Sequence, residues 1–263
     1  MIVTVGIPLD ENSSYLRGAA AAPENIRKAF HSDSANYWTE QSVNLQRHAQ
    51  LIDDGDLNLR GMPGAFEVIT AAVKQRIQQG HKVLSLGGDH SVTYPIIRGF
   101  AQNYPDLTII HLDAHGDLYD SFDGNRFSHA CPFARIMESR LATRLIQVGI
   151  RTYTGHQREQ AKRFGVEVIE MKDWRDDLRF VVDGPVYLSL DLDVMDPAFV
   201  PGVSHHEPGG LSTRQVLHII QNLECQLVGA DIVELNPTRD INGMTAMVAA
   251  KCYKEILARL LLS

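Results

Sequence analysis

Short apolar runs alternate along this chain with longer segments whose apolar residues recur at helical spacing. The apolar runs, rich in Val, Ile and Leu, cover residues 2–7, 82–86, 107–112, 144–150, 166–170, 185–192 and 226–235. They do not alternate cleanly between apolar and polar residues, which is typical of strands that are covered on both faces. We therefore predict a strand at each run.

Helical patterns fill most of the intervals between these strands. We predict helices over residues 64–80, 91–103, 131–139, 155–164, 214–223 and 244–262, and a weaker one near residues 172–180. Gly80 suits the end of the first helix, because glycine readily adopts the left-handed conformation found there. Ser212 and Gln215 have the spacing of a capping box, in which two side chains bond the free N–H groups at a helix start.

The alternation of strands and helices predicts an α/β fold. Each strand–helix–strand unit places its strands in parallel, and the helices then cover both faces of the sheet. We expect a three-layer α-β-α sandwich with a mostly parallel sheet. The length of 263 residues suits a single domain over residues 1–263, and 44% hydrophobic residues can form a sizeable core. Such sheets bind ligands at the carboxyl ends of their strands.

Charge and cysteine content narrow the functional classes. The formal net charge is -7 and no basic patch is present, so we expect no nucleic-acid partner. No apolar run approaches the ~20 residues that cross a bilayer, and residues 1–14 do not resemble a signal peptide, so we expect no membrane partner. The cysteines are odd in number and far apart, which favours a reducing, cytoplasmic location.

Acidic, histidine and amide residues lie at or just after the ends of several predicted strands. These residues are Asp89 and His90; Asp113, His115 and Asp117; Asp191, Asp193 and Asp196; and Glu234 and Asn236. Taken alone, each group has an ordinary explanation as a polar turn, a helix cap or a hydrogen-bonded loop histidine. Parallel strands bring these groups to one edge of the sheet, and their joint occurrence favours a metal site.

A metal site would explain the acidic stretch HLDAHGDLYD at residues 111–120. Without a cation, the carboxylates of Asp113, Asp117, Asp191 and Asp193 would repel one another. Two divalent ions would balance their charges. Carboxylate-rich ligation with some imidazole suits Mn²⁺, although Zn²⁺ or another first-row ion stays possible. Two such ions lower the pKa of a shared water, and the remaining negative charge would favour a cationic substrate.

The same motifs, in this order, resemble the ureohydrolase family, which includes arginases and agmatinases. The matching stretches are GGDHS (87–91), DAHGD (113–117), SLDLDVMDPAFVPG (189–202) and GADIVELNP (229–237). The resemblance extends over nearly the whole chain, from GIPLDENSSYLRGAAAAPENIR (6–27) to GMTAMVAAK (243–251). It implies an arginase-like fold and a hydrolase with two Mn²⁺ per chain. One ion would bind His90, Asp113, Asp117 and Asp191, and the other would bind His115, Asp113, Asp191 and Asp193.

The resemblance also implies a reaction, in which a hydroxide that bridges the metals attacks a guanidinium carbon and releases urea and an amine. His129, in the stretch FSHAC, would contact the substrate and protonate the leaving amine. Glu234 would grip the guanidinium through paired hydrogen bonds. Asp117 counts among the catalytic residues as well as among the ligands. His129 and Glu234 also have structural explanations, as a hydrogen-bonded loop histidine and a buried strand-end acid.

The loop YDSFDGNRFSHACPFARIME (119–138) resembles the branch of agmatinases and plant-type arginases. The small cationic guanidino substrate is then agmatine, which gives putrescine, or L-arginine, which gives ornithine. The branch favours agmatine, with arginine close behind, and the two belong to polyamine and arginine metabolism. They differ by one carboxylate, which Asn125 or Arg126 would bind, whereas Asp120 and Asp123 would oppose it.

Other functions stay open. Guanidinobutyrate is an alternative substrate. A non-catalytic regulator with the same fold would have lost ligands, and an arginase-fold deacetylase would carry a His pair elsewhere than His205 and His206.

We expect His205 and His206 to be solvated, with substrate contact or a third metal site as alternatives, and Cys131 to be a packing residue. Gly116 adds backbone freedom beside two ligands. Relatives are commonly trimers or hexamers, so we expect a homo-oligomer.

Overall fold

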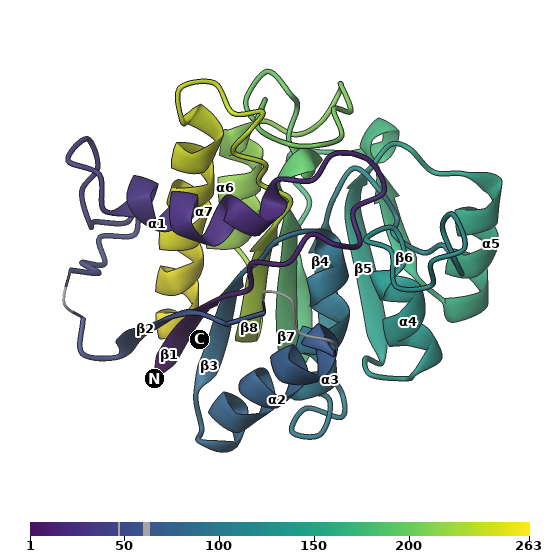
Figure 1. The fold of residues 1–263 in the computed structure, drawn as a ribbon, viewed down its shortest axis with the longest axis horizontal. Coiled ribbons are helices and arrows are strands. Elements are labelled where there is room, and N and C mark those ends of the chain that lie inside the picture. Colours follow the sequence, from purple (N-terminus) through teal and green to yellow (C-terminus); the bar gives the residue numbers. More distant parts are fainter. Residues whose placement is uncertain (47, 60–63) are drawn as a thin grey trace.

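A computed structural model of the protein describes residues 1–46, 48–59 and 64–263. Its centre is an eight-stranded sheet in the order β2-β1-β3-β8-β7-β4-β5-β6, with all neighbouring strands parallel (Figure 1). The strands are β1 (Ile2–Gly6), β2 (Leu51–Asp56), β3 (Lys82–Leu86), β4 (Thr108–Leu112), β5 (Arg144–Ile150), β6 (Glu167–Glu170), β7 (Val181–Asp191) and β8 (Glu224–Val233). Every strand predicted from the sequence is present.

Helices cover both faces of this sheet. One face packs against α1 (Ala22–Phe30), α6 (Thr213–Gln221) and α7 (Met244–Leu262). The other packs against α2 (Ala65–Gln78), α3 (Thr93–Phe100), α4 (Pro132–Glu138) and α5 (Gly155–Phe164). The expected three-layer sandwich is confirmed. In the described part of the chain, no helix combines the length and apolar character needed to span a membrane.

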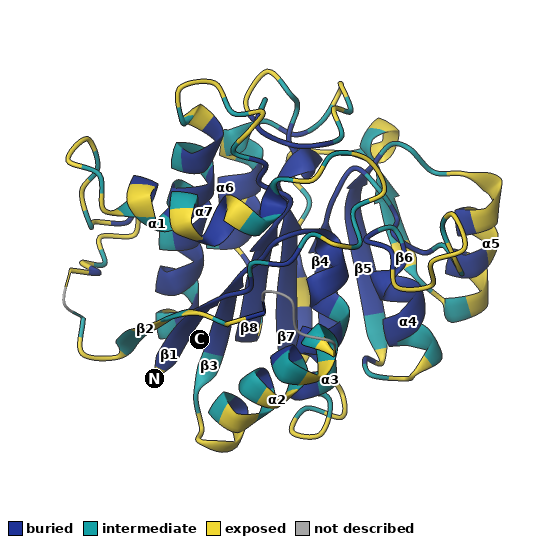
Figure 2. Ribbon diagram, viewed as in Figure 1, coloured by how far each residue is buried: buried dark blue, intermediate teal, exposed yellow. Residues whose placement is uncertain are grey.

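Successive residues of the central strands contribute to opposite cores. Leu84 and Ile110 belong to the core beneath α1, α6 and α7, whereas their chain neighbours Val83 and Ile109 belong to the core beneath α2 to α5. The central strands are buried along most of their length (Figure 2). Because both faces are covered, apolar residues occupy consecutive positions, which accounts for the missing two-residue alternation in the sequence.

The edge strand β2 was not predicted from the sequence. Its residues, LIDDGD, are mostly polar and are at most half-buried. Arg27, from α1, forms ion pairs with Asp53 and Asp56 and so balances part of the negative charge of this edge. The strand forms by backbone pairing with β1. A search for apolar runs cannot detect a strand that is held in this way.

The predicted helix near residues 172–180 is wrong. The chain makes a single 3-10 turn at Met171–Asp173 and then continues without a helix to β7. Asp176 Oδ1 accepts hydrogen bonds from Trp174 Nε1 (3.0 Å) and from Gln215 Nε2 of α6 (2.8 Å). These side-chain bonds hold the segment against its neighbour and compete with helix formation.

The helix boundaries that had clear signals agree with the sequence. α5 and α7 begin and end at the predicted residues. Ser212 and Gln215 form the predicted capping box at the start of α6. Gly80, which follows α2, has φ 78° and therefore the left-handed conformation expected after a helix.

The strand order determines where chemistry can occur. β3, β8, β7 and β4 are consecutive in the sheet although they are distant in the sequence. Because all are parallel, their carboxyl ends lie at the same edge. The segments that leave this edge carry His90, Glu234, Asp191 and Asp113, respectively.

Gly229, in β8, is a position where the packing of the sheet on α3 can be tested. A Cβ there would overlap the ring of Phe100 and lie 3.0 Å from the carbonyl oxygen of Val83. We predict that Gly229→Ala lowers the free energy of unfolding by about 1–3 kcal/mol, because the buried ring cannot shift freely. Gly155→Ala, at the open start of α5, is the control and should be neutral or slightly stabilising. Urea denaturation of both variants measures the difference, and equal stabilities would contradict the prediction.

Candidate metal centre

The predicted metal ligands meet at the carboxyl edge of the sheet. His90 lies in a 3-10 turn after β3, Asp113 directly follows β4, and Asp191 is the last residue of β7. The remaining ligands come from the turns after β4 and β7: His115, Asp117 and Asp193. His115 is half-buried and the other five are buried.

Local hydrogen bonds shape the turns that present these side chains. Asp89 Oδ1 accepts from the Ser91 N–H (3.0 Å) and caps the turn that holds His90. Asp191 Oδ1 accepts from the Asp193 N–H (2.8 Å) in the same way. Short polar side chains are favoured at such positions because they bond the free N–H groups of a turn. Asp191 is thus both a cap, through Oδ1, and a candidate ligand, through Oδ2.

His90 lies at the centre of a first group of ligand atoms. Its Nδ1 is 3.1 Å from Asp113 Oδ2, 3.1 Å from Asp191 Oδ2 and 3.2 Å from Asp117 Oδ2. Around a cation with bonds of about 2.1 Å, neighbouring ligand atoms lie roughly 3 Å apart when the bonds meet at right angles. Each of the three oxygens therefore lies at a distance from Nδ1 that fits neighbouring ligands of one cation.

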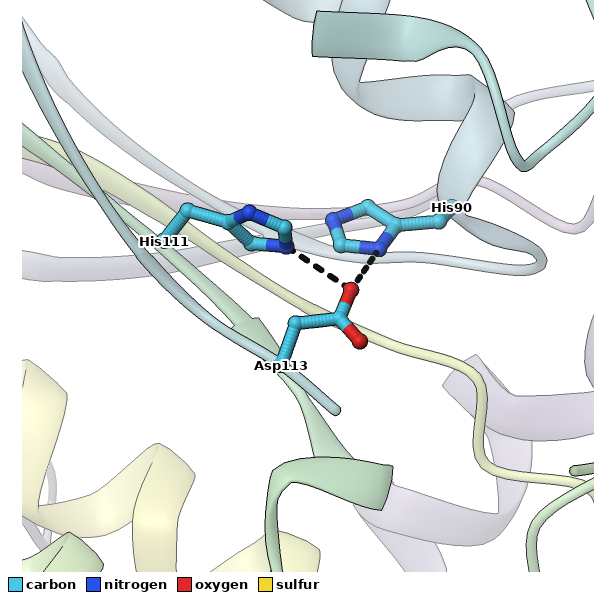
Figure 3. A group of neighbouring side chains, drawn as sticks. All are labelled: His90, His111 and Asp113. Carbon is cyan, nitrogen blue, oxygen red and sulfur yellow. Dashed lines mark hydrogen bonds and ion pairs between the residues drawn. The ribbon is translucent and has the colours of Figure 1, made fainter. Parts of the chain in front are cut away.

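Asp113 connects this group to a second one. Its Oδ2 faces His90 (Figure 3), whereas its Oδ1 is 3.3 Å from His115 Nδ1. His115 Nδ1 is also 3.0 Å from Asp193 Oδ2. Asp113, His115 and Asp193 lie close enough to share a cation. The two oxygens of Asp113 thus face two different histidines, as expected for a carboxylate between two cations.

The proton position on His90 indicates that a cation fits this site. Ser189 donates its hydroxyl to Asp231 Oδ1 (2.7 Å), so it accepts from His90 Nε2 at 3.0 Å. In neutral His90 the proton is therefore on Nε2, and the lone pair of Nδ1 points at carboxylate oxygens. Nδ1 is buried without a hydrogen-bond partner among the described residues. A cation would turn this repulsive arrangement into an attractive one.

The pKa values of the site agree with this arrangement. Burial opposes charge on His90, but the carboxylates of Asp113, Asp117 and Asp191, which would accept from a protonated Nδ1, outweigh it and raise the pKa of His90 well above its ordinary value. Burial and the charge of Asp113 outweigh the effect of His115 and raise the pKa of Asp193 to about 6. The site thus retains protons on its own, and a divalent cation would displace them.

Two acids of the site have an unusual backbone conformation. The φ angle is 48° at Asp117 and 65° at Glu234. Backbone hydrogen bonds hold both, since the Phe133 N–H donates to Asp117 O (3.2 Å) and the Glu234 N–H donates to Gly88 O (2.9 Å). Such conformations cost about 1–3 kcal/mol each. The surrounding structure, rather than local preference, therefore directs these two carboxylates.

His129 links Glu234 to the N-terminal loop. Its Nδ1 is 2.8 Å from Glu234 Oε1, an oxygen that also accepts the His90 N–H at 2.8 Å. Its Nε2 accepts the Ser14 N–H (3.2 Å) and lies 2.8 Å from Ser14 Oγ. Burial opposes charge on His129, but Glu234 outweighs it and raises the pKa of His129 to about 9. Because the Ser14 N–H requires a lone pair on Nε2, the arrangement seen is that of neutral His129; the charged form would donate to the Ser14 hydroxyl instead.

A cavity of about 240 Å³ lies over these groups. Several candidate ligands and both candidate catalytic residues line it, namely His115, Asp117, Asp191, Asp193, His129 and Glu234. The volume suits a small molecule. The arrangement can therefore hold a small substrate against a cation site, with an imidazole and a carboxylate in reach.

The predicted substrate-binding residues Asn125 and Arg126 are not among the described residues that line this cavity. Asn125 Nδ2 donates to Asn12 Oδ1 (3.1 Å) and so joins the two loops beside His129. Arg126 forms ion pairs with Asp120 and Glu138, both at 3.1 Å. A role for either residue in carboxylate binding stays a prediction.

Among the further residues that line the cavity are Ser14, His205 and Glu207, to which the sequence assigned no definite role. The His205 ring lies 5.7 Å from that of His115 and 5.3 Å from that of His129, so this half-buried histidine belongs to the cavity wall, where the sequence favoured a solvated loop residue. Its neighbour His206 is exposed, as expected. Glu207 Oε1 is 3.7 Å from His115 Nε2. The run SHHEP was the available signal, but a sequence does not show which loop side chains turn inward.

Cys131 and Gly116 both serve close packing. Cys131 is buried, as expected of a packing residue, and burial raises the pKa of its thiol to about 12. At Gly116 a Cβ would lie 2.6 Å from Gln157 Oε1 and 2.8 Å from the ring of Tyr153. The glycine beside the ligands therefore provides space for its neighbours.

Comparisons with known proteins agree with this geometry. A sequence model of the Arginase family matches residues 1–258. "Arginase 1, mitochondrial" from Arabidopsis thaliana is 46% identical, with 97% of this chain and 80% of the relative covered. "Agmatinase" from Bacillus anthracis is 32% identical, with 97% and 90% covered. The solved structure of "Arginase from Medicago truncatula" is 42% identical, superposes with a TM-score of 0.94, and covers 98% of this chain and 87% of its own.

Cation binding should depend on pH because the site holds protons. With Mn²⁺ as the probe, we predict proton release on binding. Asp193 becomes protonated as the pH drops below about 6. Below that pH, the apparent affinity for Mn²⁺ should fall about tenfold per pH unit for each proton that the ion displaces. Calorimetric titrations in buffers of different ionisation enthalpy measure both quantities, with the exposed His206→Asn variant as control. An affinity that does not change between pH 5 and pH 7, roughly the titration range of these groups, would contradict the prediction.

Proposed function

This chain belongs to the arginase family, and we propose that it is a metal-dependent hydrolase that cleaves a guanidino compound into urea and a primary amine. The observation that carries the proposal is that a carboxylate-rich cation site, Glu234 and His129 share one cavity. Hydrolysis of a guanidinium needs a carboxylate to bind it, a hydroxide to attack it and an acid to protonate the leaving amine. Each requirement has a candidate in this cavity.

We propose two Mn²⁺ ions per chain. His90 and Asp117 would hold one ion, His115 and Asp193 would hold the other, and Asp113 and Asp191 would bridge them. The contacts of His90 Nδ1 and His115 Nδ1 with separate oxygens of Asp113 support this division, and oxygen-rich ligation with some imidazole favours Mn²⁺. When bound, the ions would supply hydroxide at neutral pH by lowering the pKa of a water molecule.

Glu234 would bind the guanidinium group. Its Oε1 accepts two hydrogen bonds, from the His90 N–H and from His129, whereas Oε2 accepts none from the described residues. Burial favours the neutral acid, but His129 and the His90 N–H outweigh it and lower the pKa of Glu234. The carboxylate is therefore ionised, and Oε2 can accept an N–H of the substrate.

His129 would deliver a proton to the leaving amine. In the neutral form its Nδ1–H donates to Glu234, and Nε2 can take up a second proton. Glu234 stabilises the resulting imidazolium, which explains the pKa of about 9, and the Ser14 hydroxyl can accept from the new N–H. Ser14 and Glu234 thus hold the ring in one place in both protonation states. A positioned histidine of this kind is a typical general acid.

L-Arginine is the first substrate candidate and agmatine is the second. The greater identity to the plant arginase than to the Bacillus agmatinase, 46% against 32%, reverses the order inferred from the sequence motifs. The cavity wall also includes Thr152, Thr154, Gln157 and Glu207. The hydroxyl and amide groups can donate to a carboxylate, and Glu207 can accept from an ammonium group. Arginine carries both groups next to each other, whereas agmatine has no carboxylate.

The remaining assignments are proposals. Residues 1–263 would form one catalytic domain, and the chain would assemble into a homo-oligomer, either a trimer or a hexamer. Its partner would be a small cationic guanidino compound and neither nucleic acid nor a membrane. A cytoplasmic location stays a prediction, and the similar plant protein has "mitochondrial" in its name. Arginine as substrate would place the activity in arginine metabolism, and agmatine would place it in polyamine metabolism.

Urea release tests the proposal directly. We predict that Mn²⁺-loaded protein releases urea from L-arginine with a kcat/KM at least about tenfold higher than from agmatine, because only arginine offers a carboxylate to the polar wall. Guanidinobutyrate is assayed as a third substrate, and protein stripped of metal by a chelator is the negative control. A preference for agmatine would reverse the order of substrates. No urea from any of the three compounds, with metal bound, would exclude the proposed function for this substrate class.

The two catalytic candidates should fail in different ways. We predict that His129→Asn lowers kcat by about 10²–10⁴-fold, the usual contribution of a positioned acid. Glu234→Gln removes the charge that pairs with the guanidinium, so KM should rise as well as kcat fall. His206→Asn, an exposed histidine of the neighbouring loop, is the control and should match the wild type. Steady-state kinetics of urea release, with the metal content of each variant measured, test both predictions. Full activity in His129→Asn would contradict the role assigned to His129.

A further inference from the structure

His111 has no part in the proposed reaction, yet it is fully buried beside a candidate ligand. It lies in β4, two residues before Asp113. Its Nε2 is 2.8 Å from Asp113 Oδ2 (Figure 3). On its other side the ring stacks on Phe133 of α4, with ring centres 3.9 Å apart and planes inclined by 27°. Burying a polar ring costs free energy unless its nitrogen atoms are bonded, so the partners of both nitrogens matter.

By distance alone, His90, His111 and Asp113 could hold a cation together. The proton on His111 argues against that arrangement. Gln147, the register partner of His111 on β5, has Nε2 2.5 Å from Gly116 O, so this end of the amide must be the nitrogen. The same NH₂ group is 3.0 Å from His111 Nδ1, which must therefore accept. The ring proton is left on Nε2, where it points at Asp113, and a protonated nitrogen is not a metal ligand.

We propose that His111 is a positioning residue for the bridging carboxylate and that Gln147 determines its tautomer. The Nε2–H of His111 holds Asp113 Oδ2 toward His90, which leaves Oδ1 directed at His115. The His115 N–H donates to Oδ1 at 2.5 Å and holds that side of the carboxylate. Without the bond from His111, only this contact would orient the group, and Oδ2 could turn away from His90. The inference rests on the proposed cation pair and goes beyond it, because it concerns residues that touch neither the substrate nor the metal.

Packing alone does not explain this pair of residues. Gln147 is fully buried, and its Oε1 has no hydrogen-bond partner among the described residues. A buried, unbonded carbonyl oxygen destabilises the fold, and an apolar side chain would avoid that penalty. The amide is useful because it bonds Gly116 O and His111 Nδ1 at once. Groups that orient a metal ligand from behind commonly change metal affinity by 10–100-fold when removed.

Mn²⁺ binding to the purified full-length protein tests the proposal without reference to activity. His111→Phe keeps the stacked ring and removes the N–H, whereas His111→Gln keeps an N–H of similar reach. Gln147→Met removes the tautomer control. From calorimetry and Mn²⁺ electron paramagnetic resonance, we expect His111→Phe and Gln147→Met each to weaken binding by about 10–100-fold, with the number of ions per chain unchanged. His111→Gln should retain most of the affinity.

The double variant separates a shared mechanism from independent effects. If Gln147 acts through His111, His111→Phe with Gln147→Met should bind Mn²⁺ no more weakly than His111→Phe alone. Additive losses would overturn the tautomer argument. Loss of one bound ion in His111→Phe would make His111 a ligand, and unchanged affinity would make it a packing residue; either result overturns the proposal. Circular dichroism of the metal-free variants verifies folding. If His111→Phe does not fold, the Mn²⁺ affinities of His111→Gln and Gln147→Met still test the proposal, since only Gln147→Met should bind more weakly.

These outcomes are distinguishable from failure of the proposed function. A wild-type protein that binds Mn²⁺ tightly but releases no urea would overturn the hydrolase and leave the role of His111 intact. A wild-type hydrolase whose Mn²⁺ affinity is unaffected by His111→Phe and by Gln147→Met would overturn only the positioning role. We also expect His111→Gln to leave the KM for L-arginine unchanged at saturating Mn²⁺, because His111 does not touch the substrate.

Discussion

Buried negative charge at the carboxyl edge of the sheet is the constraint on which the rest of this structure depends. Asp113, Asp117, Asp191 and Asp193 lie within a few ångströms of two histidine nitrogens and are almost completely removed from water. Carboxylates in such a place either take up protons or find a cation. The sheet makes the constraint severe, because helices on both faces exclude water from the strands that carry these residues.

Three hydrogen-bonded chains converge on this charge, and each has a histidine in its middle. Ser189, which donates to Asp231, bonds His90; Gln147 bonds His111; and Ser14 bonds His129. On the opposite nitrogen, each histidine faces a carboxylate of the site. An outer polar group thus determines which ring nitrogen carries the proton, and the tautomer then decides whether the inner nitrogen offers a lone pair or an N–H.

The surroundings of the three histidines suit different tasks. His90 and His111 are buried in the core and are not among the described residues that line the cavity. His129 lines the cavity, and its outer partner is the hydroxyl of the exposed Ser14, which can donate or accept. A hydroxyl can therefore follow a change of protonation that the amide of Gln147 cannot. The hydroxyl partner distinguishes His129 from His111, and its place on the cavity wall distinguishes it from His90, which supports its proposed role in moving protons.

Much of this protein was determined by the sequence alone. Consecutive apolar residues indicated strands covered on both faces, and the acids and histidines that follow them indicated one shared edge, because parallel strands all end there. The ligand types, and the expectation of a cation, followed from the chemistry of carboxylates without nearby bases. The strand LIDDGD was missed because its pairing is a backbone property that polar side chains conceal, and the helix near residues 172–180 was wrongly predicted because contacts with α6 compete with it.

Only the tertiary structure could decide which side chains complete the site. Ser14, His205 and Glu207 stand in loops where no periodicity relates position to direction, and the fold turns them into the cavity. In the sequence, His111 and Gln147 are polar residues within two apolar strands. Their relation appears only in the structure, where the register of β4 and β5 makes them partners. The left-handed conformations of Asp117 and Glu234 run against local preference and persist because distant backbone groups hold them. Candidate ligands can be recognised in a sequence because they depend on residue type, whereas orientation and proton position depend on neighbours that are remote in the chain.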